Sequence, residues 1–396
     1  MDHNARIAGV GMVPFTKAGR SAAYDAMGAD AARQALADAA IDYAHVQQAY
    51  VGFVIGDTTS GQQALYPLGL TGIPIINVNN ACSTGSTALF LARQAVESGV
   101  VDVALAVGFE QMLAGPLASP FNDRPGVNGM LNAMVDRTQG WDAKAPLAAQ
   151  YFGGAGREYQ QKYGISDETF ALISVKSRRH AARNPMAVFR EPTTVEEVLA
   201  SPHIFGPLTR LQCCPPTCGA AAAVVVSAAY ARKHGLVHNG RSVRIAGQAL
   251  TTDATDSFEA GSMINGVGHG MTQRAAQQAY AQAGVTASDL DVVELHDCFT
   301  PNEIISYEAL GLCPPGGSEK FIRDGENTYG GKVVTNPSGG LLSKGHPLGA
   351  TGLAQTAEIV WHLRGEAGER QVAGARLGLQ HNVGLGGACV VTVFER

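Results

Sequence analysis

Apolar and polar positions follow two periods along this chain, and the two periods alternate. Residues 31–52, "AARQALADAAIDYAHVQQAYVG", predict an amphipathic alanine-rich helix, a short turn and an apolar strand. Residues 275–296, "AAQQAYAQAGVTASDLDVVELH", align with them without a gap and predict the same three elements. Such alternation of helix and strand is typical of an α/β protein with mostly parallel sheets covered by helices.

A second match indicates that the chain is duplicated. Residues 82–89, "CSTGSTAL", align with residues 346–353, "HPLGATGL", and both are followed by a helix and then a strand. The shared positions are Gly85 with Gly349, Thr87 with Thr351, and Leu89 with Leu353. Because the two matches occur in the same order, we expect two halves of similar plan, at about 1–115 and 240–396.

The segment between the halves, 116–202, reads differently. It opens with proline, glycine and asparagine clusters and continues into a helical pattern, "SDETFALISVKSRRHAARNP". Residues 121–190 hold 10 of the 29 lysines and arginines, which indicates either a solvated helical surface or a lobe that meets a polyanionic ligand. The following stretches "LTRLQCC" and "CGAAAAVVVSAAYARKHG" predict a buried strand and a helix, so 203–239 are assigned to the first half.

Composition excludes several classes of partner. The 396 residues are 45% hydrophobic with a formal net charge of -5, which favours neither nucleic acid nor an anionic membrane. The longest apolar run, 218–231, is shorter than the ~20 residues that span a bilayer. The seven cysteines are scattered and no secretory leader is visible, so we expect reduced thiols and a cytoplasmic location.

Cys82 lies where the strand pattern "IPIINV" ends and the helical pattern "STALFLARQAVESG" begins. A helix N-terminus stabilises negative charge and lowers the pKa of a cysteine, which favours a nucleophilic thiolate. A small buried cysteine with no chemical role is an equally good interpretation of this position alone.

The duplication favours the nucleophile. His346 stands at the position equivalent to Cys82, so a pseudo-twofold axis would bring the two loops together and give the thiol a base. A third strand-to-helix junction carries His296, Asp297 and Cys298. The glycine-rich segment "LQHNVGLGGAC" follows another strand, and its free N–H groups could form part of an oxyanion hole.

Other candidate sites are weaker. The spacing of Cys213, Cys214 and Cys218 fits no common zinc pattern, so no metal is expected. The cluster "GVGHG" lacks the strand and helix context of a dinucleotide site, and no cofactor is expected.

Four ordered motifs make the chain resemble the thiolase superfamily, and specifically the sterol-carrier-protein-2 type. They are "INVNNACSTGSTALF", "HDCF", "NPSGGLLSKGHPLGATGLAQ" and "QHNVGLGGA". The resemblance covers nearly the whole chain. It implies a five-layered α-β-α-β-α fold of two duplicated halves, with a loop domain inserted in the first. It also implies a homodimer or homotetramer, with coenzyme A and its acyl thioesters as substrates.

The resemblance also implies a role for each motif residue. Cys82 would receive the acyl group, His346 would take its proton, and Cys298 would be the second acid/base. His296 and His346 would stabilise the enolate oxygen, while the N–H groups of Cys82 and Gly384 would hold the thioester oxyanion. In this type Cys298 stands in for the cysteine that ordinary thiolases carry in their last loop, where this chain has Asn382-Val383-Gly384 instead. One departure is Thr217-Cys218, where relatives commonly have Ser-Asp, and it puts the local geometry in doubt.

The predicted function is acyl transfer between coenzyme A thioesters, either cleaving a 3-oxoacyl-CoA or condensing an acyl-CoA with acetyl-CoA. Two alternatives stay open: an aldolase subunit of steroid side-chain breakdown, and a non-catalytic acyl-CoA- or lipid-binding protein. Basic residues of the inserted lobe are candidates for the 3′-phosphate of coenzyme A, although a solvated surface explains each one singly. They are Lys176, Arg178, Arg179 and Arg183.

Overall fold

The computed structural model describes residues 4–115, 117, 121, 123–237 and 240–396. The start of the predicted inserted lobe, at 116, 118–120 and 122, and the end of the segment assigned back to the first half, at 238–239, lie outside the described residues. No helix among the described residues is long and apolar enough to cross a membrane.

The first half contains six strands of the main sheet, one of them a two-residue strand off the main strand order, and the helices between them. Its elements are β1 (Ala5–Met12), β2 (Thr16–Lys17), α1 (Tyr24–Ala39), β3 (Gln48–Gly52), α2 (Ser60–Leu65), β4 (Ile75–Val78), α3 (Thr84–Glu97), β5 (Val103–Glu110), β8 (Thr217–Ser227) and α8 (Ala228–Lys233).

The second half repeats this plan and adds short helices. Its elements are β9 (Val243–Thr251), α9 (Asp256–Glu259), α10 (Met263–Gly266), α11 (His269–Ala283), β10 (Val292–Glu294), α12 (Thr300–Ala309), α13 (Ser318–Arg323), β11 (Val334–Thr335), α14 (Gly340–Ser343), α15 (Thr351–Arg364), β12 (Leu377–Gly384) and β13 (Ala388–Glu395).

Strand order confirms the duplication. The strands run β4-β3-β5-β8-β1 in the first half and β11-β10-β12-β13-β9 in the second, which is the same order from each outer edge inward. The outer pairs are parallel and the inner pairs antiparallel in both halves. A short antiparallel contact, in which Ile7 pairs with Val243, joins the two halves between β1 and β9.

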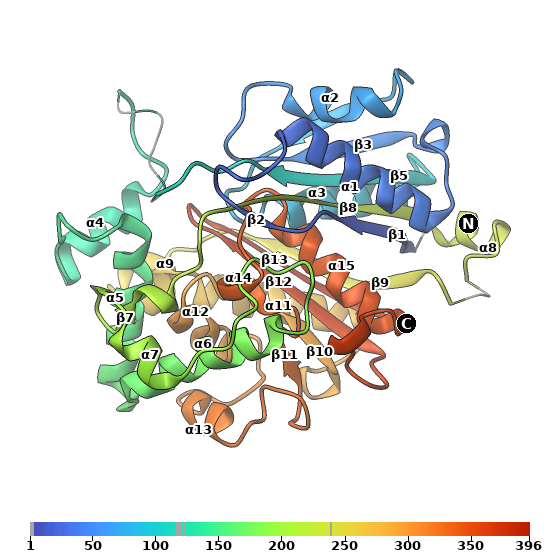
Figure 1. Ribbon diagram of the computed structural model, residues 1–396. Helices are drawn as coiled ribbons and strands as arrows, with labels where there is room; N and C mark the ends of the chain where they lie inside the picture. Colours follow the sequence, from blue (N-terminus) through green and yellow to red (C-terminus); the bar gives the residue numbers. More distant parts are fainter. Residues whose placement is uncertain (1–3, 116, 118–120, 122, 238–239) are drawn as a thin grey trace.

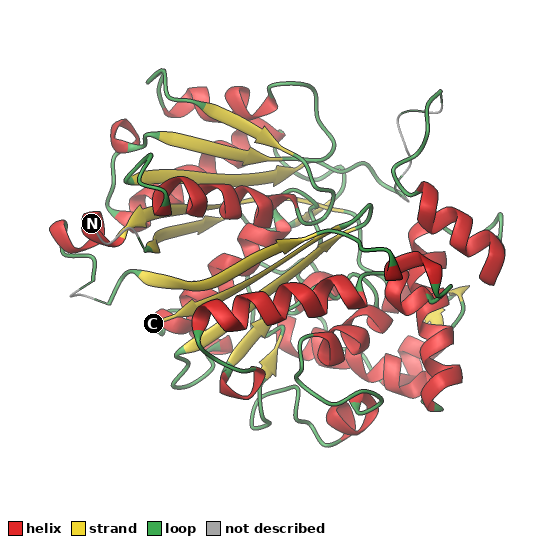
Figure 2. Cartoon of the chain, turned by 180° about the vertical axis from the view of Figure 1, so that it is seen from behind, coloured by secondary structure: helices red, strands yellow, loops and turns green. Residues whose placement is uncertain are grey.

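The helices form three layers around these strands (Figures 1 and 2). Helix α1 covers β1 and β8 on one outer face, and α11 covers β9 and β13 on the other. Helices α3 and α15 contact each other and both halves of the sheet, so they form the central layer. The five-layered α-β-α-β-α arrangement of two duplicated halves expected from the sequence is therefore confirmed.

Small residues permit the close packing of the outer layers. A Cβ atom on Gly9 would lie 2.3 Å from the carbonyl oxygen of Ala35, and one on Gly247 would lie 2.1 Å from that of Ala279. Ala35 and Ala279 are equivalent positions in the aligned repeat. Each half therefore presses its outer helix onto its sheet at a glycine where any side chain would clash.

The alanine-rich segment after the inserted lobe corrects one prediction. Residues 217–227 form the buried strand β8, not the start of a helix. Ala220 and Ala222 pack in the core under α1, whereas Ala221 and Ala223 pack in the central core with α15. Helices press on both faces of this strand, so small side chains are required there despite their helix propensity.

The inserted lobe packs against the second half. It contains α4 (Gly129–Thr138), α5 (Leu147–Tyr163), α6 (Asp167–Ala181) and α7 (Val195–Ala200). The segment after it begins with two short paired strands, β6 (His203–Phe205) and β7 (Leu208–Thr209), which contact α5 and α7. Helix α5 contacts α10 and α12, and α6 contacts α12 and α14. The lobe thus covers the elements that carry two of the three candidate catalytic loops.

Candidate active site

The first loop of the site carries Cys82 in a tight turn between β4 and α3. Ala81 has φ 48°, a left-handed conformation that is uncommon for a residue with a side chain. The Thr84 hydroxyl donates to the Ala81 carbonyl at 2.6 Å and accepts from the Asn80 N–H at 2.8 Å. These contacts hold Cys82, which is partly buried, two residues before the first residue of α3.

The second loop meets the first through backbone contacts. A Cβ atom on Gly85 would lie 2.7 Å from the carbonyl oxygen of Gly349, its equivalent in the other half. The matched threonines also have matching bonds: Thr87 donates to the Ser83 carbonyl at 3.0 Å and Thr351 to the Pro347 carbonyl at 2.9 Å. Each half therefore builds the same helix start, with Cys82 on one and His346 on the other.

The third loop brings His296 to the same place. The sulfur of Cys82 and one ring nitrogen from each of His296 and His346 all lie within 4.8 Å of one another. The two imidazole rings are 5.0 Å apart and nearly perpendicular, at 84°. Asn382, at the end of β12, lies 2.9 Å from Nδ1 of His296. The structure thus brings together the sulfur and both imidazoles singled out in the sequence.

Cys298 and Gly384 border this group. Cys298 is buried, and the pKa of its thiol is raised well above the ordinary value, first by burial and then by the nearby Cys214 and Cys82. A Cβ atom on Gly384 would lie 2.3 Å from the Asn80 carbonyl oxygen, so only glycine fits where the last loop approaches the Cys82 turn. Both residues therefore lie in the surroundings of Cys82.

Electrostatics correct one expectation from the sequence. Burial, and secondarily the carboxyl of Glu110, raise the pKa of Cys82 to about 12, so the helix terminus does not produce a resting thiolate. Burial lowers the pKa of His346 to about 3 and that of His296 well below its ordinary value. All three groups are neutral at rest, so the Cys82 thiol keeps its proton until a base accepts it.

The hydrogen bonds of His346 establish which ring nitrogen is basic. Thr351 donates its hydroxyl hydrogen to the Pro347 carbonyl, so its oxygen accepts from Nδ1 of His346 at 2.7 Å. The hydrogen of the neutral ring is then on Nδ1, and Nε2 keeps its lone pair. Nε2 is buried and has no hydrogen-bond partner among the residues that the structure describes, so its lone pair is available to a proton.

Thr217, which stands where relatives commonly have serine, contacts the backbone of His346. The Thr217 hydroxyl accepts the backbone N–H of His346 at 2.6 Å, which a serine could also do. The neighbouring Cys218, where relatives commonly have aspartate, is buried and lies 3.5 Å from the Met112 carbonyl oxygen. The replacement of Ser-Asp by Thr217-Cys218 therefore leaves the position of His346 supported.

The four basic residues considered for the phosphate of coenzyme A differ in exposure, and burial rejects one of them. Lys176 is buried and forms an ion pair with Glu303 while donating to Thr335 at 2.7 Å, so its ammonium group cannot reach a surface ligand. Arg178 is partly buried, with its guanidinium over the ring of Phe189. Arg179 and Arg183 remain exposed at the end of α6.

Glu110 is a site residue that the sequence analysis missed. It ends β5, is fully buried, and accepts the N–H groups of Val54, Ile55 and Gly349 at 2.9–3.0 Å. Burial raises its pKa to about 7. An acidic residue directly after the apolar run "VALAVGF" was the signal that could have identified it. Glu110 ties the loop after β3 to the turn that follows His346.

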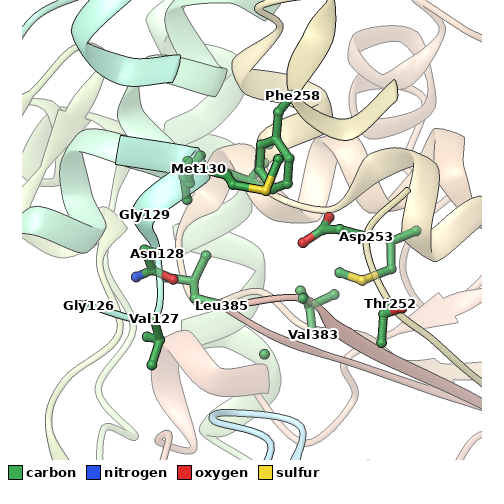
Figure 3. Close-up of a pocket in the computed structure, with 17 residues that line it drawn as sticks. Gly126, Val127, Asn128, Gly129, Met130, Thr252, Asp253, Phe258, Val383 and Leu385 are labelled. Carbon is green, nitrogen blue, oxygen red and sulfur yellow. The ribbon is translucent and has the colours of Figure 1, made fainter. Parts of the chain in front are cut away.

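A pocket of about 500 Å³ adjoins the site (Figure 3). Gly384 lines this pocket and also packs against the Cys82 turn. Met130 lies beside Phe258 on one side, and Val383 and Leu385 lie on another. The pocket is mainly apolar and suits an uncharged part of a ligand.

Comparisons with known proteins agree with this fold and site. A thiolase N-terminal domain model matches residues 5–205 and a thiolase C-terminal domain-like model matches residues 254–396. The chain belongs to the thiolase family. Within it, the chain is 51% identical to human sterol carrier protein 2 over 98% of its own length and 71% of that protein. The resemblance to the sterol-carrier-protein-2 type is therefore confirmed.

Two further relatives cover most of both chains. A Caenorhabditis elegans non-specific lipid-transfer protein-like 2 is 44% identical over 98% of this chain and 95% of that protein. The benzoylsuccinyl-CoA thiolase subunit BbsB of Thauera aromatica is 38% identical over 98% of this chain and 96% of that protein.

Solved structures show the same fold. The Ltp2-ChsH2(DUF35) aldolase superposes with a TM-score of 0.80 at 27% identity, covering 99% of this chain and 98% of that one. Human mitochondrial 3-ketoacyl-CoA thiolase in complex with CoA superposes with a TM-score of 0.72 at 18% identity over 99% and 98%, which shows the fold alone.

Proposed function

We propose that this chain is a thiolase that transfers acyl groups between coenzyme A thioesters through an acyl-Cys82 intermediate. The observation that carries the proposal is the approach of the Cys82 sulfur and the two histidine nitrogens to within 4.8 Å of one another. A thiol beside an unpartnered imidazole nitrogen is the arrangement that nucleophilic acyl transfer needs.

In the cleavage direction, the Cys82 sulfur attacks the keto carbon of a 3-oxoacyl-CoA as its proton passes to Nε2 of His346. The bond between C2 and C3 then breaks, leaving the acyl group on Cys82 and an enolate on the departing acetyl-CoA. His296 and the protonated His346 donate to the enolate oxygen. Cys298, a neutral thiol, protonates C2.

Coenzyme A completes the cycle. Its thiol gives its proton to the Cys298 thiolate as its sulfur attacks the acyl-Cys82 thioester, and the backbone N–H groups of Cys82 and Gly384 hold the oxyanion of the tetrahedral intermediate. Collapse of the intermediate releases acyl-CoA, and protonated His346 returns its proton to the sulfur of Cys82. Condensation is the same sequence in reverse. Each bond change is acyl or proton transfer, so the proposal requires no metal or other cofactor.

The substrate would enter along two features. The apolar pocket beside Gly384 suits the pantetheine or acyl part of the thioester. Exposed Arg179 and Arg183 suit the phosphates of coenzyme A, with the ring of Tyr329 lying under the Arg183 guanidinium. Substituting each arginine with alanine should raise the KM for coenzyme A and leave kcat nearly unchanged.

A homodimer in the cytoplasm is part of the proposal. Strand β4 ends the sheet, pairs with β3 on one side, and leaves all four of its residues partly exposed, which suits pairing with a second copy. All seven cysteines are free, as a reducing compartment favours. Sedimentation of the purified protein tests the oligomeric state.

The decisive experiment is mass spectrometry after incubation with an acyl-CoA. The peptide containing Cys82 should gain the mass of the acyl group in the wild-type protein and in a Cys313→Ser control. Cys82→Ala should lose both the adduct and the turnover of 3-oxoacyl-CoA. An adduct elsewhere on the chain, or unchanged turnover by Cys82→Ala, would show that the role assigned to Cys82 is wrong.

A second candidate is retro-aldol cleavage, because the aldolase structure superposes over nearly the whole chain. That reaction would leave Cys82 unmodified and release an aldehyde or ketone. Product analysis with a 3-hydroxyacyl-CoA, together with an absent acyl adduct, would favour the lyase. Binding of acyl-CoA without any turnover would favour the non-catalytic alternative.

A further inference from the structure

Buried side chains from three elements connect a backbone carbonyl group to the ring of His296. Gln355 on α15 donates to the His381 carbonyl at 3.1 Å, and Gln380 on β12 donates to Gln355 Oε1 at 3.1 Å and to Ser86 Oγ at 2.6 Å. Ser86 on α3 donates to Asn382 Oδ1 at 2.9 Å, and Asn382 Nδ2 lies 2.9 Å from His296 Nδ1. Each of these side chains is at most 2% exposed.

The direction of every hydrogen bond in this relay follows from its starting point. A backbone carbonyl only accepts, so Gln355 must present its nitrogen to His381 and its oxygen to Gln380. Gln380 then uses both amide hydrogens, one on Gln355 and one on Ser86. Because Ser86 accepts from Gln380, its own hydrogen goes to Asn382 Oδ1. That fixes which end of the Asn382 amide faces the histidine.

The end of the relay determines the tautomer of His296. Asn382 presents its NH₂ group to Nδ1 of His296, so Nδ1 accepts and the hydrogen of the neutral ring is on Nε2. His346 has the opposite tautomer, with the hydrogen on Nδ1. Two neutral imidazoles 5.0 Å apart therefore differ in function: His346 offers a lone pair and His296 offers a hydrogen.

We propose that Ser86 and Gln380 are positioning residues that hold His296 as the Nε2–H tautomer, and thereby make it a hydrogen-bond donor rather than a second base. The consequence for catalysis rests on the proposed thiolase function, whereas the tautomer itself does not. The helices that carry Ser86 and Gln355 pack closely here, because a Cβ atom on Gly352 of α15 would lie 2.0 Å from the Ser86 hydroxyl oxygen. The relay joins both halves of the duplication at the centre of the molecule.

The tautomers can be measured on the unmodified protein. In a long-range ¹H–¹⁵N correlation spectrum of protein labelled with ¹⁵N-histidine, His296 should carry its hydrogen on Nε2 and His346 on Nδ1. Single His296→Asn and His346→Asn variants assign the signals. A hydrogen on Nδ1 of His296 would overturn the proposal, and this result does not depend on whether the protein has thiolase activity.

Variants test the relay as the cause. In Ser86→Ala the His296 signals should change to a mixture of both tautomers while the His346 signals stay unchanged. Thr356→Val is the matched control, because Thr356 is a buried residue of α15 whose hydroxyl donates to its own helix at Gly352. A single Nε2–H tautomer persisting in Ser86→Ala would refute the role of Ser86.

Kinetics separate a positioning role from a structural one. Ser86→Ala should lower kcat about tenfold with little change in KM, as loss of a residue that orients a catalytic group does. An asparagine at 296 has no tautomers, so in a His296→Asn background the same change should cost less than about twofold. Equal losses in the two backgrounds would show that Ser86 supports the fold and not His296. If no thiolysis is detected in the wild type, the proposed function fails and the spectrum alone decides the tautomer.

Discussion

Glu110 should make the stability of this protein depend on pH in a direction that is unusual for an acidic residue. Its carboxyl is fully buried and faces three backbone N–H groups, from Val54, Ile55 and Gly349. Burial is the dominant effect and raises its pKa from 4.5 to about 7, while the three N–H groups partly oppose it. Glu110→Gln removes the titration and keeps the shape.

The magnitude follows from the two pKa values. Between 4.5 and about 7 the folded chain retains a proton that the unfolded chain has lost, so the free energy of unfolding falls as pH rises. With one pKa unit equal to ~1.4 kcal/mol, the carboxyl contributes about 2.5 kcal/mol more at pH 5 than at pH 8. In Glu110→Gln one N–H group faces the amide nitrogen, which costs about 1–3 kcal/mol at every pH.

Urea unfolding of both proteins from pH 5 to pH 8 tests this reasoning. The advantage of the wild type over Glu110→Gln should shrink by about 2.5 kcal/mol across this range, because all other groups are common to the two proteins. Removing the carboxylate should also speed iodoacetamide modification of Cys82 above pH 7, since Glu110 helps to raise the pKa of that thiol. A constant difference, or one that grows with pH, would refute the argument.

Three further substitutions have defined outcomes. Thr351→Val removes the acceptor of the His346 Nδ1–H, so acylation of Cys82 should slow about tenfold in stopped-flow assays without a change in the thermal midpoint larger than a few degrees. Lys176→Met leaves Glu303 as an unpaired buried carboxylate and should destabilise the fold by about 3–5 kcal/mol in urea unfolding, while the KM for coenzyme A of the folded fraction stays unchanged. Gly349→Ala should abolish acylation of Cys82, detected by mass spectrometry, because its Cβ would lie 2.4 Å from the carbonyl oxygen of Phe109, and normal acylation would show that the turn can yield.

The fold was largely predictable from the sequence because the two halves share small residues that pack directly against backbone atoms. Gly85 and Gly349 are restricted by contacts that allow no side chain, and alanines of α1 and α11 pack against Gly9 and Gly247, so the two copies still align. The same restriction explains why the loops of Cys82 and His346 could be matched before any coordinates. The prediction for residues 218–227 was wrong, because their alanines favour a helix locally. They form strand β8 instead, where helices packed on both faces of the sheet require small side chains.

The charges of the site were less predictable. The pKa of Cys82 depends on burial and on Glu110, which is 28 positions away in sequence. The position of Cys82 at a helix start therefore predicted a lowered pKa, whereas the pKa is raised. Lys176 belongs to a basic run in the sequence, yet its side chain turns into the protein toward Glu303. Neither effect has a local pattern, because each arises from partners that only the folded chain brings close.

The contact between Gly85 and Gly349 has a mechanical consequence. Peptide units meet there without intervening side chains, so no change of rotamer can lengthen or shorten the gap between the sulfur-bearing turn and the imidazole-bearing turn. The separation of the two turns is thus a property of the main chain. Residues of the inserted lobe can then change to accommodate other acyl groups without changing the separation of the two central turns.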